Sequence, residues 1–253
     1  MTVTDSSRPL TPLRLATWML LTGQLLYIIV TQFHSGGDAN DHQAIFAHYA
    51  EDGAWSPVHI GQLLGMALLL GGLIVLNFAF ESQNKSTAWL ARCGVAVAAA
   101  TLALYGALQA VDGVALKQAV VAWTTAPEAE KATRFATAEA IRWLEWGMRS
   151  YQDFMLGMAL LICASALASV RSPLRRIAVL VGLSGAAYLA QGWFAGTEGF
   201  SPNQSIAIVA GWTICLIWMI WLAVVAERSG NAFARSHEAG NGELQMATSS
   251  ASI

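Results

Sequence analysis

Charged residues are scarce in this chain. Asp, Glu, Lys and Arg make up 12% of its 253 residues, and hydrophobic residues make up 55%, whereas soluble domains carry about 25% charged residues. The mean hydropathy is +0.49. This composition excludes an ordinary soluble domain and predicts a chain that crosses a membrane several times. The net charge of −2 says nothing about nucleic acid, and no basic cluster suggests it, so we expect no nucleic-acid partner.

Cysteine is also rare, and the familiar catalytic motifs are missing. Cys93, Cys163 and Cys215 each lie in an apolar stretch, outside any Cys-x-x-Cys pattern, which is typical of buried thiols rather than of a disulfide or metal site. The sequence has no phosphate-binding glycine loop and no Ser-His-Asp pattern. It therefore leaves open whether the protein is an enzyme.

Prolines are few, and five of the six mark expected helix starts. Proline suits the first helical turn because its missing N–H would have no partner there, and a preceding Ser or Thr can cap the helix. Thr125 followed by Glu128 is typical of a capping box. No proline interrupts an apolar run. The five are Pro12, Pro57, Pro127, Pro173 and Pro202.

Six apolar stretches have about 20 residues each, the length that a bilayer core requires. The first is too long and too rich in leucine for a secretory signal, so we expect it to be retained. The expected fold is an all-α polytopic membrane helix bundle, with one transmembrane domain over 1–226. Residues 227–253, rich in Gly, Ser, Ala and Asn, are expected to form a disordered cytoplasmic tail. The expected spans are 12–33, 57–80, 87–110, 150–170, 174–195 and 203–226.

Positive charge predicts the orientation. With the N-terminus inside, nine of the 14 Lys and Arg residues lie on the inner side, in agreement with the positive-inside rule. We expect a protein of the plasma membrane, in contact with the lipid bilayer, with both termini cytoplasmic. The nine are Arg8, Arg14, Lys85, Arg92, Arg171, Arg175, Arg176, Arg228 and Arg235.

Two connections on the expected outer side, 34–55 and 112–147, are long. The first contains a short helix over Asp41–Glu51, which we expect to lie in the membrane interface. Its apolar side carries Ile45, Phe46 and Tyr49.

The second long connection leads into a helix that begins at Pro127. If this helix continued to Val170 it would have 44 residues and be about 66 Å long, twice the thickness of the hydrocarbon core. Either it projects outward by several turns, or it breaks, and Gly147 is then the expected point of the break.

An internal repeat is also expected. The hexapeptide LGMALL occurs at 64–69 and again at 156–161, an offset of 92 residues, and an Arg and a Tyr each recur at an offset of 83 residues. We interpret spans two–three and four–five as parallel repeats, an arrangement that often places transporter sites at the repeat interface. The alternative is an old hairpin duplication without mechanistic consequence. The recurring pairs are Arg92 with Arg175 and Tyr105 with Tyr188.

Two motifs carry a resemblance to a known group. One is WSPVHIGQ at 55–62, and the other runs from Gly157 through Pro173-Leu174-Arg175 to Tyr188 and Gly192. In these the chain resembles a broad group of uncharacterised bacterial six-helix membrane proteins, classed as a domain of unknown function. The resemblance covers most of residues 12–226. It implies the fold, and it implies no activity or site residue.

Residues 139–153, EAIRWLEWGMRSYQD, carry the most informative pattern. A charge at membrane depth costs about 2.5–3.5 kcal/mol on insertion scales, so it normally faces a protein interior or water. At 100° per residue, charged and aromatic side chains take one face of this helix and apolar ones the other. The charged and aromatic face either is solvated on a projecting helix or forms a polar pocket at the outer mouth of the bundle. Glu145 and Arg149 have the i,i+4 spacing of an ion pair.

The pocket interpretation gives a set of candidate residues. Carboxylates could act as acids, and the catalytic candidates are Glu139, Glu145 and Asp153. Tryptophans could stack on a cation or a planar ligand. The expected ligand-binding residues are His59, Gln62, Asp112, Arg142, Trp143, Trp146 and Arg149.

Four of the five histidines lie on the expected outer side. His34 and His59 are at the outer ends of the first two spans, where they could face each other and bind Zn²⁺ or haem. The further ligands would be Asp38, Asp41 or Glu139. The spacing is poor for a metal, since no His-Glu-x-x-His occurs. We therefore expect no metal and no cofactor, with His34 and His59 as the weak candidates for a metal.

Three functions compete. The first is a polar and aromatic pocket for an apolar or amphipathic small molecule, which opens to the outer face. A variant of it is an intramembrane enzyme that acts on an isoprenoid-like substrate by acid chemistry. The others are a transporter-like protein, which predicts more ionisable groups deep in the membrane, and a structural subunit without chemistry.

Overall fold

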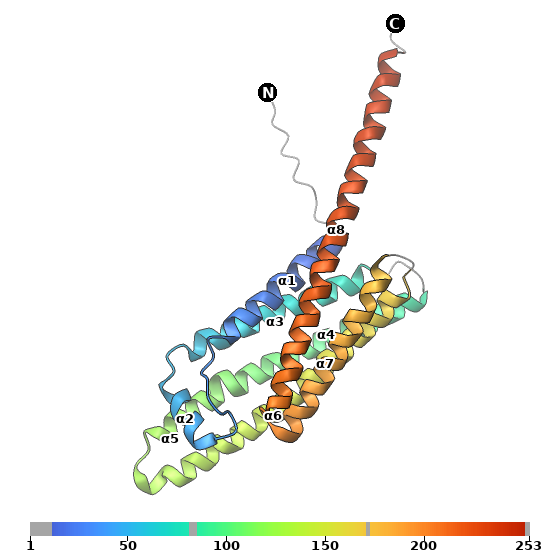
Figure 1. Ribbon diagram of the computed structural model, residues 1–253. Helices are drawn as coiled ribbons and strands as arrows, with labels where there is room; N and C mark the ends of the chain where they lie inside the picture. Colours follow the sequence, from blue (N-terminus) through green and yellow to red (C-terminus); the bar gives the residue numbers. More distant parts are fainter. Residues whose placement is uncertain (1–11, 81–84, 171–172, 251–253) are drawn as a thin grey trace, which may run out of the picture.

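The computed structural model describes residues 12–80, 85–170 and 173–250. Every element in these residues is helical, and six helical segments are long and apolar enough to cross a membrane (Figure 1). The expected all-α membrane helix bundle is therefore confirmed. The elements are α1 (Pro12–Thr31), α2 (His42–Glu51), α3 (Trp55–Phe78), α4 (Lys85–Ala110), η1 (Val111–Leu116), α5 (Lys117–Thr124), α6 (Glu128–Ala168), η2 (Pro173–Arg176), α7 (Ile177–Glu198) and α8 (Pro202–Ser250).

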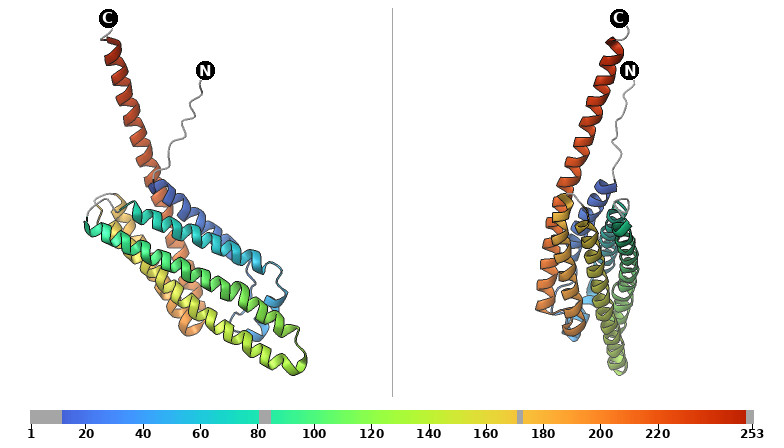
Figure 2. Two further views of the ribbon diagram at one scale, coloured as in Figure 1. Left: turned by 180° about the vertical axis from the view of Figure 1, so that it is seen from behind. Right: turned by 90° about the vertical axis from the view of Figure 1, so that its right-hand side faces the viewer.

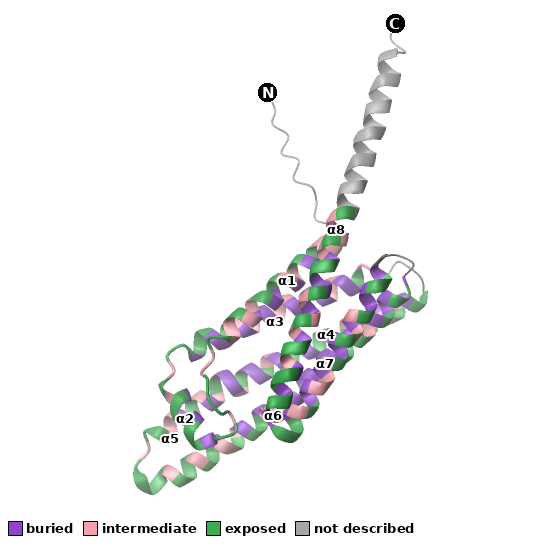
Figure 3. Cartoon of the chain, in the orientation of Figure 1, coloured by how far each residue is buried: buried purple, intermediate pink, exposed green. Residues whose placement is uncertain are grey.

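The six spans leave large apolar side chains on the outside of the bundle. Trp18, Ile29, Leu64 and Val209 are each more than half exposed, and exposed segments follow the outer faces of the helices in Figure 3. In water such a surface would be costly. In a bilayer it is the expected lipid-facing surface of a polytopic protein.

Both ends of the membrane-spanning part lie at the same end of the bundle. Arg14, near the start of α1, pairs with Glu227 of α8 through Nε and Oε1 at 3.0 Å. The opposite end carries α2 and α5 (Figure 1), and we call it the α2 end. Helix α8 continues to Ser250, and the disorder and cytoplasmic location of residues 227–253 stay predictions.

Two helical segments extend past the rest of the bundle at the α2 end. Lys85–Thr124 forms one continuous span of 40 residues, and α6 has 41 residues, or about 62 Å. Figure 2 shows their joined tips beyond the ends of α7 and α8. Helix α6 passes through Gly147 without a break. Of the two alternatives for this region, the projecting helix is therefore the one that forms.

The short helix α2 does form over the expected residues, but its apolar face does not lie in the membrane interface. Ile45, Phe46 and Tyr49 are buried in a small core with Trp55 of α3 and with residues of α5 and α6. The prediction of an interfacial helix was wrong because the projecting α5–α6 hairpin offers α2 an apolar surface within the protein.

Proline and its neighbours mark most helix starts as expected. Pro12 and Pro202 are the first residues of α1 and α8, and the Oγ of Ser201 accepts from the N–H of Gln204 at 3.2 Å. The capping box at Thr125 was wrong. The N-cap of α6 is Pro127, without a side-chain cap, and the hydroxyl of Thr125 donates instead to the carbonyl of Val121 at 2.8 Å.

Glycines allow the closest helix contacts. A Cβ atom at Gly65 would lie 2.9 Å from the backbone N of Tyr27 in α1, and one at Gly157 would lie 2.8 Å from the carbonyl oxygen of Gly185 in α7. Such backbone-to-backbone contact is typical of membrane helix pairs. Gly65 and Gly157 are equivalent in the proposed repeat but contact helices that are not equivalent. The repeat stays a prediction.

Candidate functional site

A cavity of about 280 Å³ lies inside the bundle toward the α2 end. Six of the residues predicted as catalytic or ligand-binding candidates meet in its wall, although they come from three separate segments of the chain. The lining combines charged residues of η1 and α6 with apolar and aromatic residues from other parts of the chain. The six are Gln62 of α3, Asp112 of η1, and Arg142, Glu145, Arg149 and Asp153 of α6.

Helix α6 supplies most of the charge because its two faces differ. Arg142, Glu145 and Asp153 are at most 3% exposed, whereas Leu144 and Tyr151 are 55% and 68% exposed. This is the orientation that the spacing predicts, since a lipid-facing carboxylate at this depth would cost several kcal/mol. The charged face therefore turns into the protein.

Arg142 and Glu145 form a buried ion pair. Arg142 also donates to the carbonyl of Ala39 and to the hydroxyl of Tyr49, each at 3.3 Å, and its guanidinium lies 4.8 Å from the ring centre of Phe200. Burial raises the pKa of Tyr49 to about 12, so that its hydroxyl stays protonated. Several elements therefore hold this guanidinium in place.

The predicted pairing of Glu145 with Arg149 was wrong. Glu145 takes its i,i+3 neighbour Arg142 as its partner, and Arg149 donates through Nη1 to the hydroxyl of Tyr27 at 3.1 Å. The Nε of Arg149 has no hydrogen-bond partner among the described residues. None of the ion pairs found in that part of the chain includes Arg149.

A π-helical turn, η1, interrupts the α4–α5 helix and places Asp112 in the cavity wall. The indole of Trp55 donates through Nε1 to the carbonyl of Gly113 at 3.0 Å. A Cβ atom at Gly113 would lie 2.9 Å from the Cβ of His59, so only glycine permits this approach of η1 to α3. The result is a distance of 3.3 Å between His59 Nε2 and Asp112 Oδ2. Such turns are often found at functional sites.

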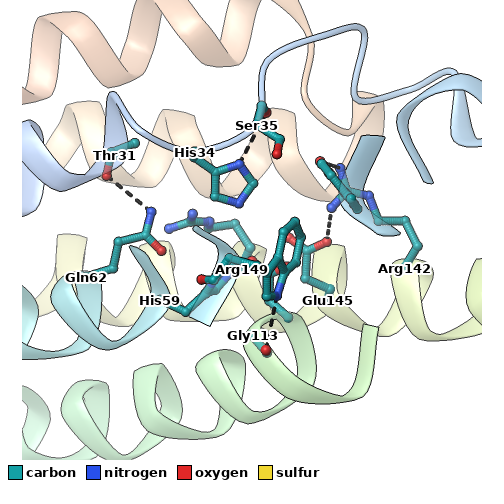
Figure 4. A network of polar contacts seen from close by, with 12 residues as sticks. Thr31, His34, Ser35, His59, Gln62, Gly113, Arg142, Glu145 and Arg149 are labelled. Carbon is teal, nitrogen blue, oxygen red and sulfur yellow. Dashed lines mark hydrogen bonds and ion pairs between the residues drawn. The ribbon is translucent and has the colours of Figure 1, made fainter. Parts of the chain in front are cut away.

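His34 follows α1 and completes this corner of the cavity. Its ring centre lies 5.2 Å from that of His59, so the expected approach of these two histidines does occur. Figure 4 shows His34, His59 and Arg149 gathered between the helices. Burial lowers the pKa of His34 below its ordinary value of 6.5, although Asp112 acts in the opposite direction. We therefore expect a neutral imidazole at pH 7.

Other predicted residues lie outside the cavity. Glu139 pairs with His42 at 3.0 Å, and Trp143 is 54% exposed. Trp143 and Trp146 instead line a second, more open hollow of about 420 Å³ between α6 and α7. Asp41, a candidate metal ligand on sequence grounds, caps α2 by accepting from the N–H of Ala44 at 3.2 Å.

Three helices contribute to the cavity in a way that the sequence pattern did not predict. They had the composition of plain apolar spans, and the available signal was an isolated Tyr or Gln within each. The residues that these three helices contribute to the cavity lining include Tyr27 of α1, Tyr188 and Gln191 of α7, and Gln204, Ile208 and Trp212 of α8.

The fold and the cavity together define a multi-pass helical membrane protein with a polar, partly charged chamber in its interior. Comparisons with protein-family models, with curated proteins and with solved structures found no match for the chain. Its function is therefore inferred from the chemistry of the chamber.

Proposed function

We propose that the protein binds an amphipathic small molecule in the cavity at the α2 end. The polar group of that molecule contacts Arg149, and its apolar part packs against Met66, Ile208 and Trp212. The observation that carries the proposal is the mixed charged and apolar lining of one cavity within the helix bundle.

The lining suits an amphipathic compound better than a purely apolar one. Ligand sites are mostly apolar, with a few polar groups that fix the orientation of the ligand. Here Asp112, Arg149 and Asp153 supply charge to the lining, and Ile208 and Trp212 of α8 supply apolar and aromatic surface. The volume of about 280 Å³ is near the lower end of the usual range of about 300–1,000 Å³. A small metabolite or the headgroup end of a lipid fits these limits.

Arg149 indicates what the polar group is. A guanidinium has five N–H donors, and the hydrogen bond found for Arg149 uses one of them. Its Nε is buried and has no hydrogen-bond partner among the described residues, which is unfavourable for a polar group. The ligand therefore presents a carboxylate, a phosphate or a neutral oxygen to Arg149.

The cavity opens toward the outside if the membrane orientation is as predicted. Arg14, Lys85, Arg175 and Arg176 all precede or begin helices at the end opposite α2, and positive charge favours the cytoplasmic side. A reporter fused at Glu130 then reads external. A cytoplasmic signal at that position contradicts the orientation without affecting the cavity itself.

The acid-chemistry alternative receives less support from the geometry. It requires Glu139 or Glu145 beside the aromatic rings of Trp143 and Trp146. Glu145 lines the cavity, but both tryptophans line the other hollow. The residues needed for that chemistry are therefore divided between two places.

Two isoleucines on α8 provide a matched test. Ile208 lines the cavity, and Ile206, two residues earlier, is 69% exposed on the outer surface. Tryptophan at 208 fills the cavity, and tryptophan at 206 adds the same mass to the lipid-facing side. Small molecules extracted from purified wild-type, Ile208→Trp and Ile206→Trp protein are compared by mass spectrometry.

The proposal predicts a compound that is enriched with the wild type and with Ile206→Trp and is reduced at least about tenfold with Ile208→Trp. Retention of the same compounds by all three proteins, with all three folded, contradicts it.

A further inference from the structure

His34, His59 and Asp112 form a cluster that an organic ligand at Arg149 does not explain. One ligand atom from each residue lies within 4.8 Å of the others. The three side chains come from the segment after α1, from the first turns of α3 and from η1. We propose that they bind a divalent transition-metal ion through two imidazole nitrogens and a carboxylate oxygen. His34 and Asp112 belong to the lining of the same cavity, and the metal proposal holds whatever organic ligand that cavity takes.

The hydrogen bonds of His59 indicate which nitrogen faces Asp112. Nδ1 of His59 lies 2.8 Å from the carbonyl oxygen of Trp55, and since a carbonyl only accepts, Nδ1 carries the hydrogen. In the neutral ring Nε2 is then an acceptor. It lies 3.3 Å from Oδ2 of Asp112, which is also an acceptor. Two acceptors at this distance need a cation between them, either a proton or a metal ion.

His34 is oriented in the same way. Its Nδ1 lies 3.3 Å from the carbonyl oxygen of Ser35, which leaves Nε2 as the nitrogen available to a metal. Metal-bound histidines commonly donate their other N–H to a backbone carbonyl, which fixes the tautomer and the ring orientation. Both histidines already have this second partner.

The distances fit a metal site that has yet to close around its ion. Zinc bonds to nitrogen and oxygen are about 2.0–2.2 Å long, so neighbouring ligands of a tetrahedral site are about 3.3 Å apart. His59 and Asp112 already have this separation. His34 needs to approach by on the order of 1 Å, and it lies in the segment that joins α1 to α2 rather than within a helix.

Charge balance favours a cation in the same place. Glu145 has Arg142 as its partner, whereas the ion pairs found among the described residues give Asp112 no Lys or Arg partner, only His59 at 3.3 Å. Oδ1 of Asp112 and Nε2 of His59 are buried, and neither has a hydrogen-bond partner among the described residues. A buried carboxylate at membrane depth is costly unless it is paired, and a divalent ion provides that pairing.

The arrangement resembles an open metal site rather than a closed one. Three protein ligands leave a position for water or substrate, as in catalytic zinc sites. Two imidazoles and one carboxylate also suit Fe²⁺. Because His34 and Asp112 line the cavity, the vacant position faces the chamber.

Elemental quantification by plasma mass spectrometry tests the proposal directly. The protein is purified through a tag without histidine and without chelators, and the wild type is compared with His34→Ala, Asp112→Asn and His48→Ala. His48 is an exposed histidine of α2 and serves as the control. Asp112→Asn keeps the size of the side chain and guards against a result caused by unfolding of His34→Ala.

The proposal predicts about one metal ion per chain in the wild type and in His48→Ala, and at least about a tenfold loss in the other two variants. The same measurement distinguishes Zn²⁺ from Fe²⁺. Equal metal content in all four proteins contradicts the proposal. A wild type that lacks metal as purified, and that gains no visible cobalt absorption when Co²⁺ is added, also contradicts the proposal. In that case the cation between His59 and Asp112 is a proton.

Discussion

Replacing Glu145 by glutamine removes one charge from a deeply buried ion pair. Its partner Arg142 is 2% exposed and Glu145 is 1% exposed. Loss of one member of such a pair leaves the other uncompensated, at a cost of about 3–5 kcal/mol. The carbonyl of Ala39 and the hydroxyl of Tyr49 still accept from Arg142, so we expect the lower end of that range, about 3 kcal/mol.

A matched control lies on the same helix. Glu130 and Arg134 form an ion pair of 3.0 Å whose side chains are 53% and 52% exposed. Exposed i,i+4 pairs contribute about 0.3–0.5 kcal/mol. A destabilisation of about 1 kcal/mol lowers the melting temperature by about 2–4 °C in a protein of 150–250 residues. Glu145→Gln should therefore lower it by about 6–12 °C, and Glu130→Gln by about 1–2 °C.

Thermal unfolding in a single detergent, followed by tryptophan fluorescence, measures both variants. The double variant Arg142→Met/Glu145→Leu should recover much of the loss, because no unpaired charge from this pair then remains in the protein. Equal small shifts for Glu145→Gln and Glu130→Gln would mean that this part of α6 is solvated, and the assignment of a buried charged wall to the cavity would be wrong.

Two further predictions concern the α2 end. The ammonium of Lys117 donates at 2.6–3.0 Å to three carbonyls at the end of α2. In thermal melts Lys117→Met should therefore cost about 2 kcal/mol of stability, whereas the exposed Lys131→Met should cost under about 0.5 kcal/mol. Equal shifts in melting temperature for the two variants would contradict this role of Lys117. Gly113→Ala should lower the melting temperature because its Cβ meets His59, whereas Gly106→Ala, with no atom within 4 Å of its Cβ, should leave it unchanged or raise it.

The membrane spans and the inward face of α6 could be predicted from the sequence because each follows from a strong local signal. Runs of about 20 apolar residues have few alternatives. The spacing of Arg142, Glu145, Arg149 and Asp153 places them on one side of any helix, and the cost of charge in hydrocarbon decides which way that side turns.

The partners of those charges could not be predicted, because they depend on other helices. Spacing allows Glu145 to pair with Arg142 or with Arg149. The hydroxyl of Tyr27, which comes from α1, accepts from Arg149 and thereby favours the first choice. Nothing in the local sequence around Glu145 contains that information.

The grouping around His59 was predicted only in part, because Asp112 was a ligand-binding candidate but was not joined to the two histidines as a metal ligand. The metal expectation considered Asp38, Asp41 and Glu139, which are close to the histidines in sequence or on the predicted helix face. Asp112 lies 53 residues after His59, and a π-helical turn brings it to the imidazole. The local sequence VDGVAL of η1 did not indicate that this turn would form.

Native mass spectrometry of the intact protein, released from lipid nanodiscs, tests the central claim most directly. Ligand binding in the cavity predicts a discrete, stoichiometric small-molecule adduct on the wild type. The adduct should be retained by Arg134→Met, which changes an exposed arginine of α6, and should be lost from Arg149→Met, measured at a temperature where both variants are folded. A wild type that carries no such adduct, or an adduct that Arg149→Met retains in full, would contradict the proposal that this cavity binds a ligand through Arg149.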